Sequence, residues 1–288
     1  MLKPRGLLFG TAGVPLASPK PSSVEGVKTV RSLGLDAMEL EFVRGVRMSD
    51  KLAEEVRKVS EELGVLLTAH APYYVNLNSP EEAKVRASVE RIKDTARAAH
   101  RCGGWSIAFH AAYYGDDEPE AVHGRVKELV KGLVKELRDE GVEVWVRPET
   151  AGGLAEYGNL REVVELSKEV EGVLPCIDFA HLHARTRGGY NTYDDLASLL
   201  VFLERELEEE CLKNMHAHFS GIEYGERGEI RHANLEGSGY NYEALVDVLR
   251  DFKVEGVMIS ESPNIEGDAL LLKKLYGSRS ARPAPKRA

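Results

Sequence analysis

Cysteine is scarce in this sequence of 288 residues: there are three, and no two of them form a CxxC pair. Their spacing argues against a disulfide framework and against a zinc site built on thiolates. Cys176 lies inside an apolar run, and we expect it to be a small buried residue. No apolar run reaches the roughly 18 residues of a transmembrane helix. The apolar piece near residue 7 is too short for a signal peptide, so we expect a cytoplasmic protein.

An excess of basic charge is also absent. Lys and Arg number 38 against 47 Asp and Glu, which gives a formal net charge of −9. This charge argues against broad, sequence-independent attraction to nucleic acid, although a local basic patch is compatible with it. The glycine pattern GxGxxG is missing after the first apolar run, where the sequence reads GTAGVP. A doubly wound sheet that binds a dinucleotide is therefore disfavoured.

The sequence does contain a regular alternation of two kinds of segment. Amphipathic stretches of helical periodicity, such as 49–63 with its capping serine, separate short apolar runs. Eight runs are predicted to be strands: 6–10, 37–42, 65–70, 105–110, 142–149, 173–178, 214–219 and 256–261. Because strands that alternate with helices form a parallel sheet, eight units predict an α/β fold with a single (β/α)8 TIM barrel over residues 1–276. We expect the basic segment 277–288 to be a disordered tail.

Histidines and carboxylates gather where these predicted strands end. In a TIM barrel the active site lies at the carboxyl ends of the strands. Seven of the nine histidines and three acids fall there, in six consecutive units: His70, His110, Glu149, Asp178, His181, His183, His216, His218, His232 and Glu261. A single histidine at a strand end is most often a hydrogen-bonded structural residue, but six converging units favour a metal site.

Imidazoles and carboxylates together suit zinc, and manganese or iron less well. Ten candidate side chains exceed the needs of one tetrahedral ion, so we expect two or three metal ions bridged by a carboxylate. Such a cluster stabilises the attacking and the leaving oxygens of a phosphodiester and lowers the pKa of bound water. The residues therefore predict a hydrolase, with phosphate ester cleavage as the leading reaction type.

The order of the motifs resembles that of the endonuclease IV family, the zinc-dependent apurinic/apyrimidinic endonucleases, and particularly its archaeal branch. The matching segments are HAPYYVNL (70–77), AFH (108–110), PETAGG (148–153), CIDFAHLHA (176–184), MHAHFSG (215–221), RHANLEGSG (231–239) and SESP (260–263). The resemblance implies a cluster of three zinc ions. The implied ligands are His70, His110 and Glu149 for the first metal, Glu149, Asp178, His216 and Glu261 for the second, and His181 and His232 for the third.

The sequence departs from the family pattern at the third metal. The family has an aspartate two residues before the last histidine, and here that position is Ile230, which cannot bind a metal. Glu229, one residue away, is one candidate for the missing ligand; a water molecule or a neighbouring histidine is another. His183 and His218 are expected to contact the ligands more than to bind metal themselves.

The resemblance also implies contacts with damaged duplex DNA. The segment FVRGVRM (42–48) resembles the loop that carries the family's intercalating arginine, and Arg47 occupies that place. Tyr73 and Tyr74 match a second wedge position, where aromatic rings can stack on exposed bases. The alternative is that these tyrosines only close the rim of the barrel. Arg185 and Arg187 are either phosphate contacts or part of a solvated loop.

The resemblance implies hydrolysis of the phosphodiester 5′ to abasic sites in duplex DNA, the incision step of base excision repair. Glu149 and Glu261 would be the catalytic carboxylates, and we expect the protein to be a monomer. Selectivity would come from flipping, because a sugar without a base enters a tight pocket at the lowest cost. The alternative is a sugar isomerase or epimerase of the xylose isomerase-like barrels. A metal-stabilised barrel that binds damaged DNA without cutting is a third hypothesis.

Overall fold

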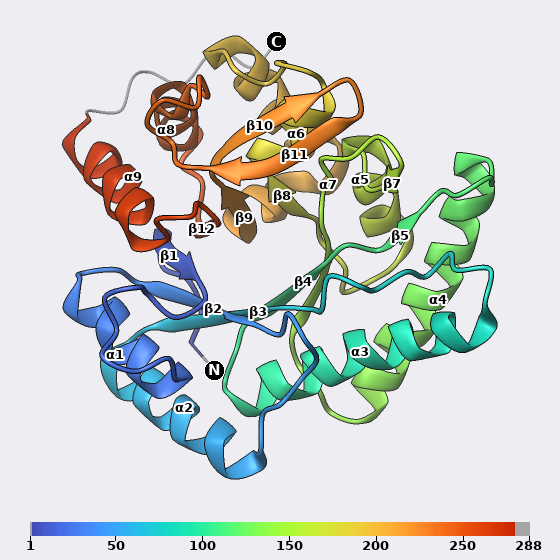
Figure 1. Ribbon diagram of the computed structural model, residues 1–288, viewed down its shortest axis with the longest axis horizontal. Helices are drawn as coiled ribbons and strands as arrows, with labels where there is room; N and C mark the ends of the chain where they lie inside the picture. Colours follow the sequence, from blue (N-terminus) through green and yellow to red (C-terminus); the bar gives the residue numbers. More distant parts are fainter. Residues whose placement is uncertain (1, 280–288) are drawn as a thin grey trace.

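The structure, a computed structural model that describes residues 2–279, is an eight-stranded parallel barrel with helices around it (Figure 1). The strands neighbour one another in the order β6-β4-β3-β2-β1-β12-β9-β8. Parallel bridges from Val146 to Val173 and from Glu149 to Cys176 connect the two edges of this sheet. The predicted (β/α)8 TIM barrel is therefore confirmed.

The eight barrel strands coincide with the eight apolar runs of the sequence. Their bounds are β1 Leu7–Ala12, β2 Ala37–Glu41, β3 Leu66–His70, β4 Ser106–Phe109, β6 Trp145–Pro148, β8 Cys176–Asp178, β9 Met215–Phe219 and β12 Gly256–Ser260. Most of their residues are buried, because helices cover the outer face and facing strands fill the inner one.

Seven helices occupy the predicted amphipathic stretches. They are α1 Ser23–Ser32, α2 Asp50–Leu63, α3 Glu82–Arg101, α4 Pro119–Asp139, α5 Leu160–Glu169, α7 Tyr193–Lys213 and α8 Tyr242–Asp251. Local signals set their ends. The side chain of Ser49 caps α2 by accepting a hydrogen bond from the Leu52 N–H, and Gly64 ends that helix with a φ of 66°. No helix among residues 2–279 is long and apolar enough to cross a membrane.

Several elements were not predicted from the sequence. They are the short helix α6 Phe179–Arg185, the hairpin of β10 Gly221–Gly225 and β11 Gly228–Ala233, the two-residue strands β5 Ala112–Tyr113 and β7 Glu156–Tyr157, and the last helix α9 Glu266–Ser278. The hairpin and the two short strands lie beyond the carboxyl ends of barrel strands, and the hairpin is the orange ribbon in Figure 1. They build the walls of the candidate site.

Helix α9 corrects the predicted start of the tail. Gly277 and Ser278 are helical, and Arg279 forms ion pairs with Glu243 and Asp247 of α8. These pairs hold Arg279 against α8, so residues 277–279, the first three of the predicted tail, are ordered. The remaining tail residues, 280–288, lie outside the described residues.

The interior of the barrel is layered. Near the amino ends of the strands lies a small apolar cluster that includes Ala37, Leu66 and Val257. Above it lies a middle layer of buried polar side chains, Glu39, Thr68, Ser106, Arg147 and His216. The carboxyl ends of the strands carry most of the histidines and acids predicted to form the site. Because TIM barrel interiors are usually filled by branched apolar side chains, both polar layers require a specific explanation.

Candidate metal centre

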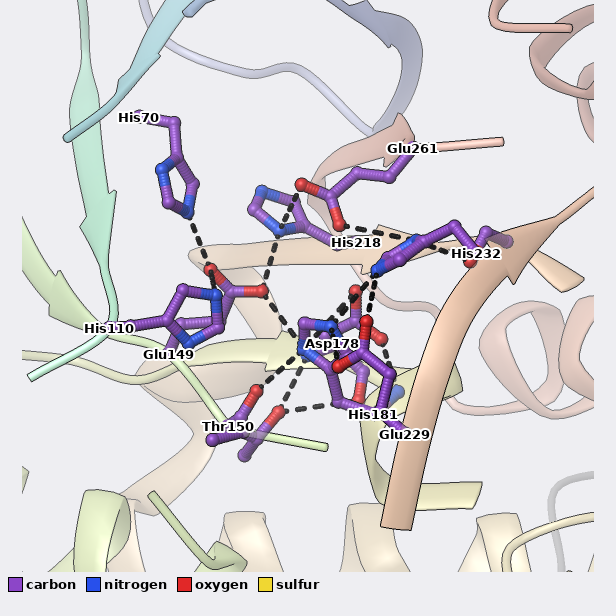
Figure 2. A network of polar contacts seen from close by, with 12 residues as sticks. His70, His110, Glu149, Thr150, Asp178, His181, His218, Glu229, His232 and Glu261 are labelled. Atoms are coloured by element: carbon purple, nitrogen blue, oxygen red, sulfur yellow. Dashed lines mark hydrogen bonds and ion pairs between the residues drawn. The ribbon is translucent and has the colours of Figure 1, made fainter. Parts of the chain in front are cut away.

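The predicted site residues converge on a pocket of about 290 Å³ at the carboxyl ends of the strands. Figure 2 shows His70 and His110 approaching Glu149 from one side, while His181, Glu229 and His232 gather on the other. Among the described residues, four groups have ligand atoms within 4.8 Å of one another: His70–Glu149–His218–Glu261, His110–Glu149–His181, Asp178–His181–His232–Glu261 and, deeper in the barrel, Cys176–His216–His218. Their overlap produces one continuous cluster. The sets discussed below regroup these residues by the metal ion that each set would hold, and the third set adds Glu229.

The first ligand group is built on β3, the end of β4 and the end of β6. The Nδ1–H of His70 donates to the carbonyl of Ala71 at 2.7 Å, which turns Nε2 toward Glu149 Oε2 at 2.8 Å. His110 Nε2 lies 3.6 Å from the same oxygen. Two imidazole nitrogens and one carboxylate oxygen thus face a common point, a donor set that suits zinc.

The second ligand group joins Glu149 to Asp178, His218 and Glu261. His218 Nδ1 lies 3.0 Å from Glu149 Oε1 and 3.4 Å from Glu261 Oε1. Asp178 ends β8 and caps α6: its Oδ1 accepts the N–H of His181, while its buried Oδ2 has no hydrogen-bond partner. A buried carboxylate oxygen without a donor is costly, so the free Oδ2 fits a position that binds a cation.

The third ligand group consists of His181, Glu229 and His232. His181 Nε2 lies 3.1 Å from His232 Nε2 and 3.2 Å from Glu229 Oε2, and His232 Nε2 lies 3.3 Å from Glu229 Oε1. Ligands about 2.0–2.1 Å from a tetrahedral zinc ion lie roughly 3.3 Å from one another. The two histidine nitrogens, and the Glu229 oxygen beside each of them, therefore lie at about the spacing of zinc ligands.

A β-bulge explains how Glu229 takes the place expected for residue 230. Along the hairpin, Glu223 pairs with Arg231 and Tyr224 pairs with Glu229, so Ile230 is an extra, unpaired residue in β11. The side chain of Ile230 is 65% exposed. Because a bulge reverses the alternation of side chains along a strand, Glu229 points to the same face as His232. The bulge thus brings Glu229, one of the candidates for the missing third ligand, next to His181 and His232.

Two glycines allow the hairpin to approach the PETAGG loop closely. The Glu229 N–H donates to the carbonyl of Gly152, and the Leu154 N–H donates to the carbonyl of Arg227. A Cβ on Gly152 would lie 2.5 Å from Glu229 Oε2, and one on Gly228 would lie 2.2 Å from the Gly152 carbonyl oxygen. Any larger side chain at either glycine would push Glu229 away from His181.

The carboxylates of the cluster shift the pKa values of its histidines. Burial lowers the pKa of His70, but the hydrogen bond to Glu149 and the nearby negative charges outweigh burial and raise the pKa to about 10. For His181 burial acts in the same direction, and the charges of Asp178 and Glu229 again raise the pKa. Burial raises the pKa of Glu149, but the charges of His110 and His218 hold it well below its usual range. Such a cluster favours positive charge at its centre.

The comparisons with known proteins agree with this geometry. A family model described as xylose isomerase-like TIM barrel matches residues 27–278. The chain belongs to the xylose isomerase-like TIM barrel family. An uncharacterized protein of Methanocaldococcus jannaschii is 41% identical over 270 residues, which cover 94% of this chain and 97% of that protein. A probable endonuclease 4 of Symbiobacterium thermophilum is 25% identical over 250 residues, 83% of this chain and 88% of that protein.

Two of the solved structures that this chain resembles are an endonuclease and an epimerase-like protein. Endonuclease IV from Thermus thermophilus superposes with a TM-score of 0.71 and 24% identity, covering 95% of this chain and 98% of that one. A D-tagatose 3-epimerase-like protein superposes with a TM-score of 0.69 and 17% identity, covering 93% and 96%. At these identities the superpositions establish the fold. With the endonuclease 4 relatives, they confirm the resemblance to endonuclease IV noted in the motifs.

In this barrel His218, and not His216 as expected, lies beside the candidate ligands at the carboxyl ends of the strands. Both face the interior from β9, but His218 is closer to the carboxyl end and contacts Glu149 and Glu261. His216 is fully buried in the middle layer, where its neighbours are Ser106 and Glu39. His218 is therefore the candidate ligand beside Glu149, whereas His216 shares a candidate group only with Cys176 and His218, and its role in metal binding stays a prediction. The strand ends at Phe219, so the histidine nearer that end was the better candidate.

Two further predictions for this barrel are corrected by the contacts of α6 and its following loop. The His183 Nδ1–H donates to the Gly189 carbonyl at 2.7 Å, and its ring packs against Tyr224 and Tyr240, away from the ligand groups. Arg185 is half-buried, and its guanidinium is engaged by the chain itself. Its guanidinium donates to the carbonyls of Ala151 and Gly153, so it holds the PETAGG loop in place.

Two acids of β2 were not predicted to be site residues. Glu39 and Glu41 alternate in the run AMELE, and both point into the barrel. Glu39 belongs to the middle layer, whereas Glu41 lines the pocket beside His70 and belongs to none of the ligand groups. Burial raises the pKa of Glu41 to about 8. Two acids with strand alternation in an apolar run are a signal that should have indicated an interior position.

Tyr73, Tyr74 and Arg47 lie at the rim of this barrel. Tyr73 lines the pocket and is 65% exposed, and Tyr74 packs edge-on against it with ring centroids 5.4 Å apart. The Arg91 guanidinium lies over the Tyr74 ring at 4.5 Å. Arg47 is exposed. Their exposure suits contact with a large substrate, and the predicted role of all three in binding DNA stays a prediction.

Cys176 is buried as expected, but it also lies within 4.8 Å of ligand atoms of His216 and His218. Burial raises the pKa of its thiol to about 12. Because metal binding requires the thiolate, Cys176 is a poor ligand beside the carboxylates above it.

Proposed function

We propose that this chain is a metal-dependent endonuclease that hydrolyses the phosphodiester 5′ to abasic sites in duplex DNA. The observation that carries the proposal is the set of His181, Glu229 and His232, three candidate zinc ligands beside two groups that share Glu149. The nine proposed ligand side chains exceed what one or two four-coordinate ions require. The probable endonuclease 4 relatives support the same assignment.

The metal ligands divide into three sets in this proposal. His70, His110 and Glu149 would hold one zinc ion, Glu149, Asp178, His218 and Glu261 the second, and His181, Glu229 and His232 the third; manganese is the alternative metal. When bound, these ions supply Lewis-acid chemistry, which stabilises charge on phosphate oxygens and makes water a better nucleophile.

The two carboxylates assigned to catalysis differ in their access to the pocket. The Glu149 side chain is fully buried and its two oxygens face different ligand groups, so its role is to hold the cluster together. The Glu261 side chain is 18% exposed and lines the pocket. Glu261 is thus the carboxylate that can touch substrate, orient an attacking water and accept its proton.

The rim residues supply the selectivity in this proposal. Tyr73, Tyr74 and Arg47 would occupy the gap at the abasic site and stack on the bases beside it. The pocket of about 290 Å³ would admit a sugar-phosphate without a base more easily than a complete nucleotide. The proposal also places the protein in the cytoplasm as a monomer.

Incubation of the zinc-loaded protein with duplex DNA that carries one tetrahydrofuran site tests the proposal. We expect one incision, 5′ to the site, that leaves a 3′-hydroxyl, and none in the matched undamaged duplex. A folded protein with bound zinc or manganese that leaves this duplex intact would contradict the activity. Binding without incision would instead support the hypothesis of a non-catalytic, metal-stabilised barrel.

A sugar isomerase or epimerase is the second candidate, and Glu41 is the observation that favours it. This buried carboxyl group lines the pocket and has no ligand role, as expected of a proton-transfer group for a small substrate. Assays with ketohexoses and a count of bound metal distinguish the two. Three zinc ions without sugar turnover support the endonuclease, and a single ion with epimerisation supports the sugar enzyme.

A further inference from the structure

Glu39 is a buried acid of the middle layer that the proposed reaction does not use. It has no exposed surface, and its ion pairs among residues 2–279 are with His216 and His218 alone. Its Oε2 lies 3.0 Å from His216 Nε2, and its Oε1 lies 2.9 Å from His218 Nε2. These contacts are close but not linear hydrogen bonds, since the ring N–H directions miss the oxygens. A buried carboxylate is costly, so its retention here needs an explanation.

The middle layer determines which nitrogen of His216 carries the proton. Arg147 is fully buried, and its Nε–H donates to Ser106 Oγ at 2.8 Å. Because a guanidinium can only donate, the Ser106 hydroxyl accepts this bond and is free to donate onward to His216 Nδ1 at 2.9 Å. His216 then carries its proton on Nε2, and this proton faces Glu39.

The same argument continues from Glu39 to the metal centre. The His218 Nε2 lies 2.9 Å from Glu39 Oε1, and a carboxylate at this distance favours a proton over a lone pair on that nitrogen. The lone pair of His218 is then left on Nδ1, which faces Glu149 and Glu261. His70 has the opposite arrangement, because its Nδ1–H donates to the Ala71 carbonyl and its Nε2 faces Glu149. The Nδ1 atoms of His181 and His232 contact the Thr150 carbonyl and the Ser220 hydroxyl, and the His181 Nδ1 also lies 3.3 Å from Glu149 Oε1.

We propose that Glu39 is a positioning residue of the metal centre: its carboxylate keeps the proton of His218 on Nε2, so that this histidine offers Nδ1 to the metal. The proposal rests on the metal centre of the proposed function and adds the residue that orients its most deeply buried histidine. Partners that fix the tautomer and direction of a metal-binding histidine typically change metal affinity by about 10–100-fold when they are removed.

Nitrogen-15 NMR of the zinc-loaded protein tests the proposal without any substitution. Long-range proton–nitrogen correlations distinguish a histidine bound through Nδ1 from one bound through Nε2, and the His218 signals are assigned by their loss in His218→Gln. We expect a protonated Nε2 and a metal-bound Nδ1 at His218. A metal-bound Nε2 at His218 in a protein that holds zinc would overturn this proposal and leave the endonuclease proposal intact. A folded protein that takes up no zinc would overturn both.

Glu39→Gln supplies the second test, with Thr68→Val as the matched control. Thr68 pairs in register with Glu39, is equally buried, and its hydroxyl has no hydrogen-bond partner. We expect Glu39→Gln to weaken the binding of one zinc ion by about 10–100-fold, to alter the visible spectrum of the cobalt-substituted protein, and to remain folded. Thr68→Val should leave the zinc affinity and the cobalt spectrum unchanged. Equal zinc affinity and identical spectra in the two variants would refute the role of Glu39.

Discussion

Two histidines of the barrel interior have opposite pKa shifts. His70 belongs to the layer of candidate metal ligands at the carboxyl ends of the strands, here called the metal layer, and His216 belongs to the middle layer. Burial lowers the pKa of both. At His70, Glu149 and other acids outweigh burial and raise the pKa to about 10. At His216, burial prevails over the charge of Glu39 and the pKa falls to about 4. Both histidines are buried, but their pKa values shift in opposite directions, because several acids surround His70, whereas the positive charges of His218 and Arg147 offset Glu39 at His216.

The two layers contain the same types of residue, histidines and acids, but use them for different functions. The middle layer is closed off from the pocket, because none of its five residues lines the pocket; His216 lies between Ser106 and Glu39, and Arg147 donates to Ser106. The metal layer is open to the pocket, which is lined by His70, His181, Glu229, His232 and Glu261. An open layer with excess negative charge requires cations, and a closed one positions the groups that bind them.

The largest effect is expected from Glu261→Gln, which removes the one cluster carboxylate assigned to touch substrate. Incision of the abasic duplex should fall by about 10²–10⁴-fold, because the amide cannot accept a proton or neutralise a cation. Gel-based incision assays measure this loss, and circular dichroism should show an intact fold. Glu156→Gln is a control, since Glu156 also lines the pocket but belongs to no ligand group. Undiminished incision by Glu261→Gln would remove this residue from the mechanism.

Glu229→Gln should affect one metal only. We expect the loss of about one zinc ion per chain, or a fall of about 10–100-fold in its affinity, because the third group retains two histidines. Ile230→Ala is the matched control on the same bulge and should keep full zinc content, because Ile230 points to solvent. Metal analysis after dialysis measures both variants. Full zinc content in Glu229→Gln would show that another ligand completes the site.

The stability of the zinc-free protein should fall as the pH rises. The pKa of His70 is raised from 6.5 to about 10, so its contribution is complete below pH 6.5 and is lost between pH 6.5 and 10. We expect the free energy of unfolding to decrease by about 1–3 kcal/mol between pH 7 and 9. The decrease is no larger, because neighbouring groups share the charge. Urea unfolding in the presence of a chelator measures it. The zinc-loaded protein should lack this decrease, and equal chelated stability at both pH values would contradict the account.

Tyr73→Ala should have the smallest effect among these changes. Loss of one stacking contact weakens binding by about 1–3 kcal/mol, so the Kd for the abasic duplex should rise by roughly 10-fold or more while zinc content is unchanged. Fluorescence anisotropy with labelled duplex measures the change. Val201→Ala, an exposed apolar side chain on α7, is the control. Equal affinity in both variants would favour the alternative that Tyr73 only closes the rim.

The sequence predicted the barrel because its apolar runs and amphipathic stretches report directly on burial. It also located His70, Glu149 and Asp178, since strand ends meet on one face of a TIM barrel. It could not predict the bulge at Ile230, because a bulge depends on pairing between two strands of a hairpin. Motif matching alone chose His216 over His218, and only the depth of each residue in the barrel separates the two.

The number of zinc ions bound per folded chain tests the central claim most directly. Elemental analysis of the purified, zinc-equilibrated protein, combined with native mass spectrometry, gives this number. The three ligand groups around Glu149, completed by Glu229 and His218, predict three zinc ions per chain. A folded protein that holds only one ion, or none, under zinc-replete conditions would contradict the account.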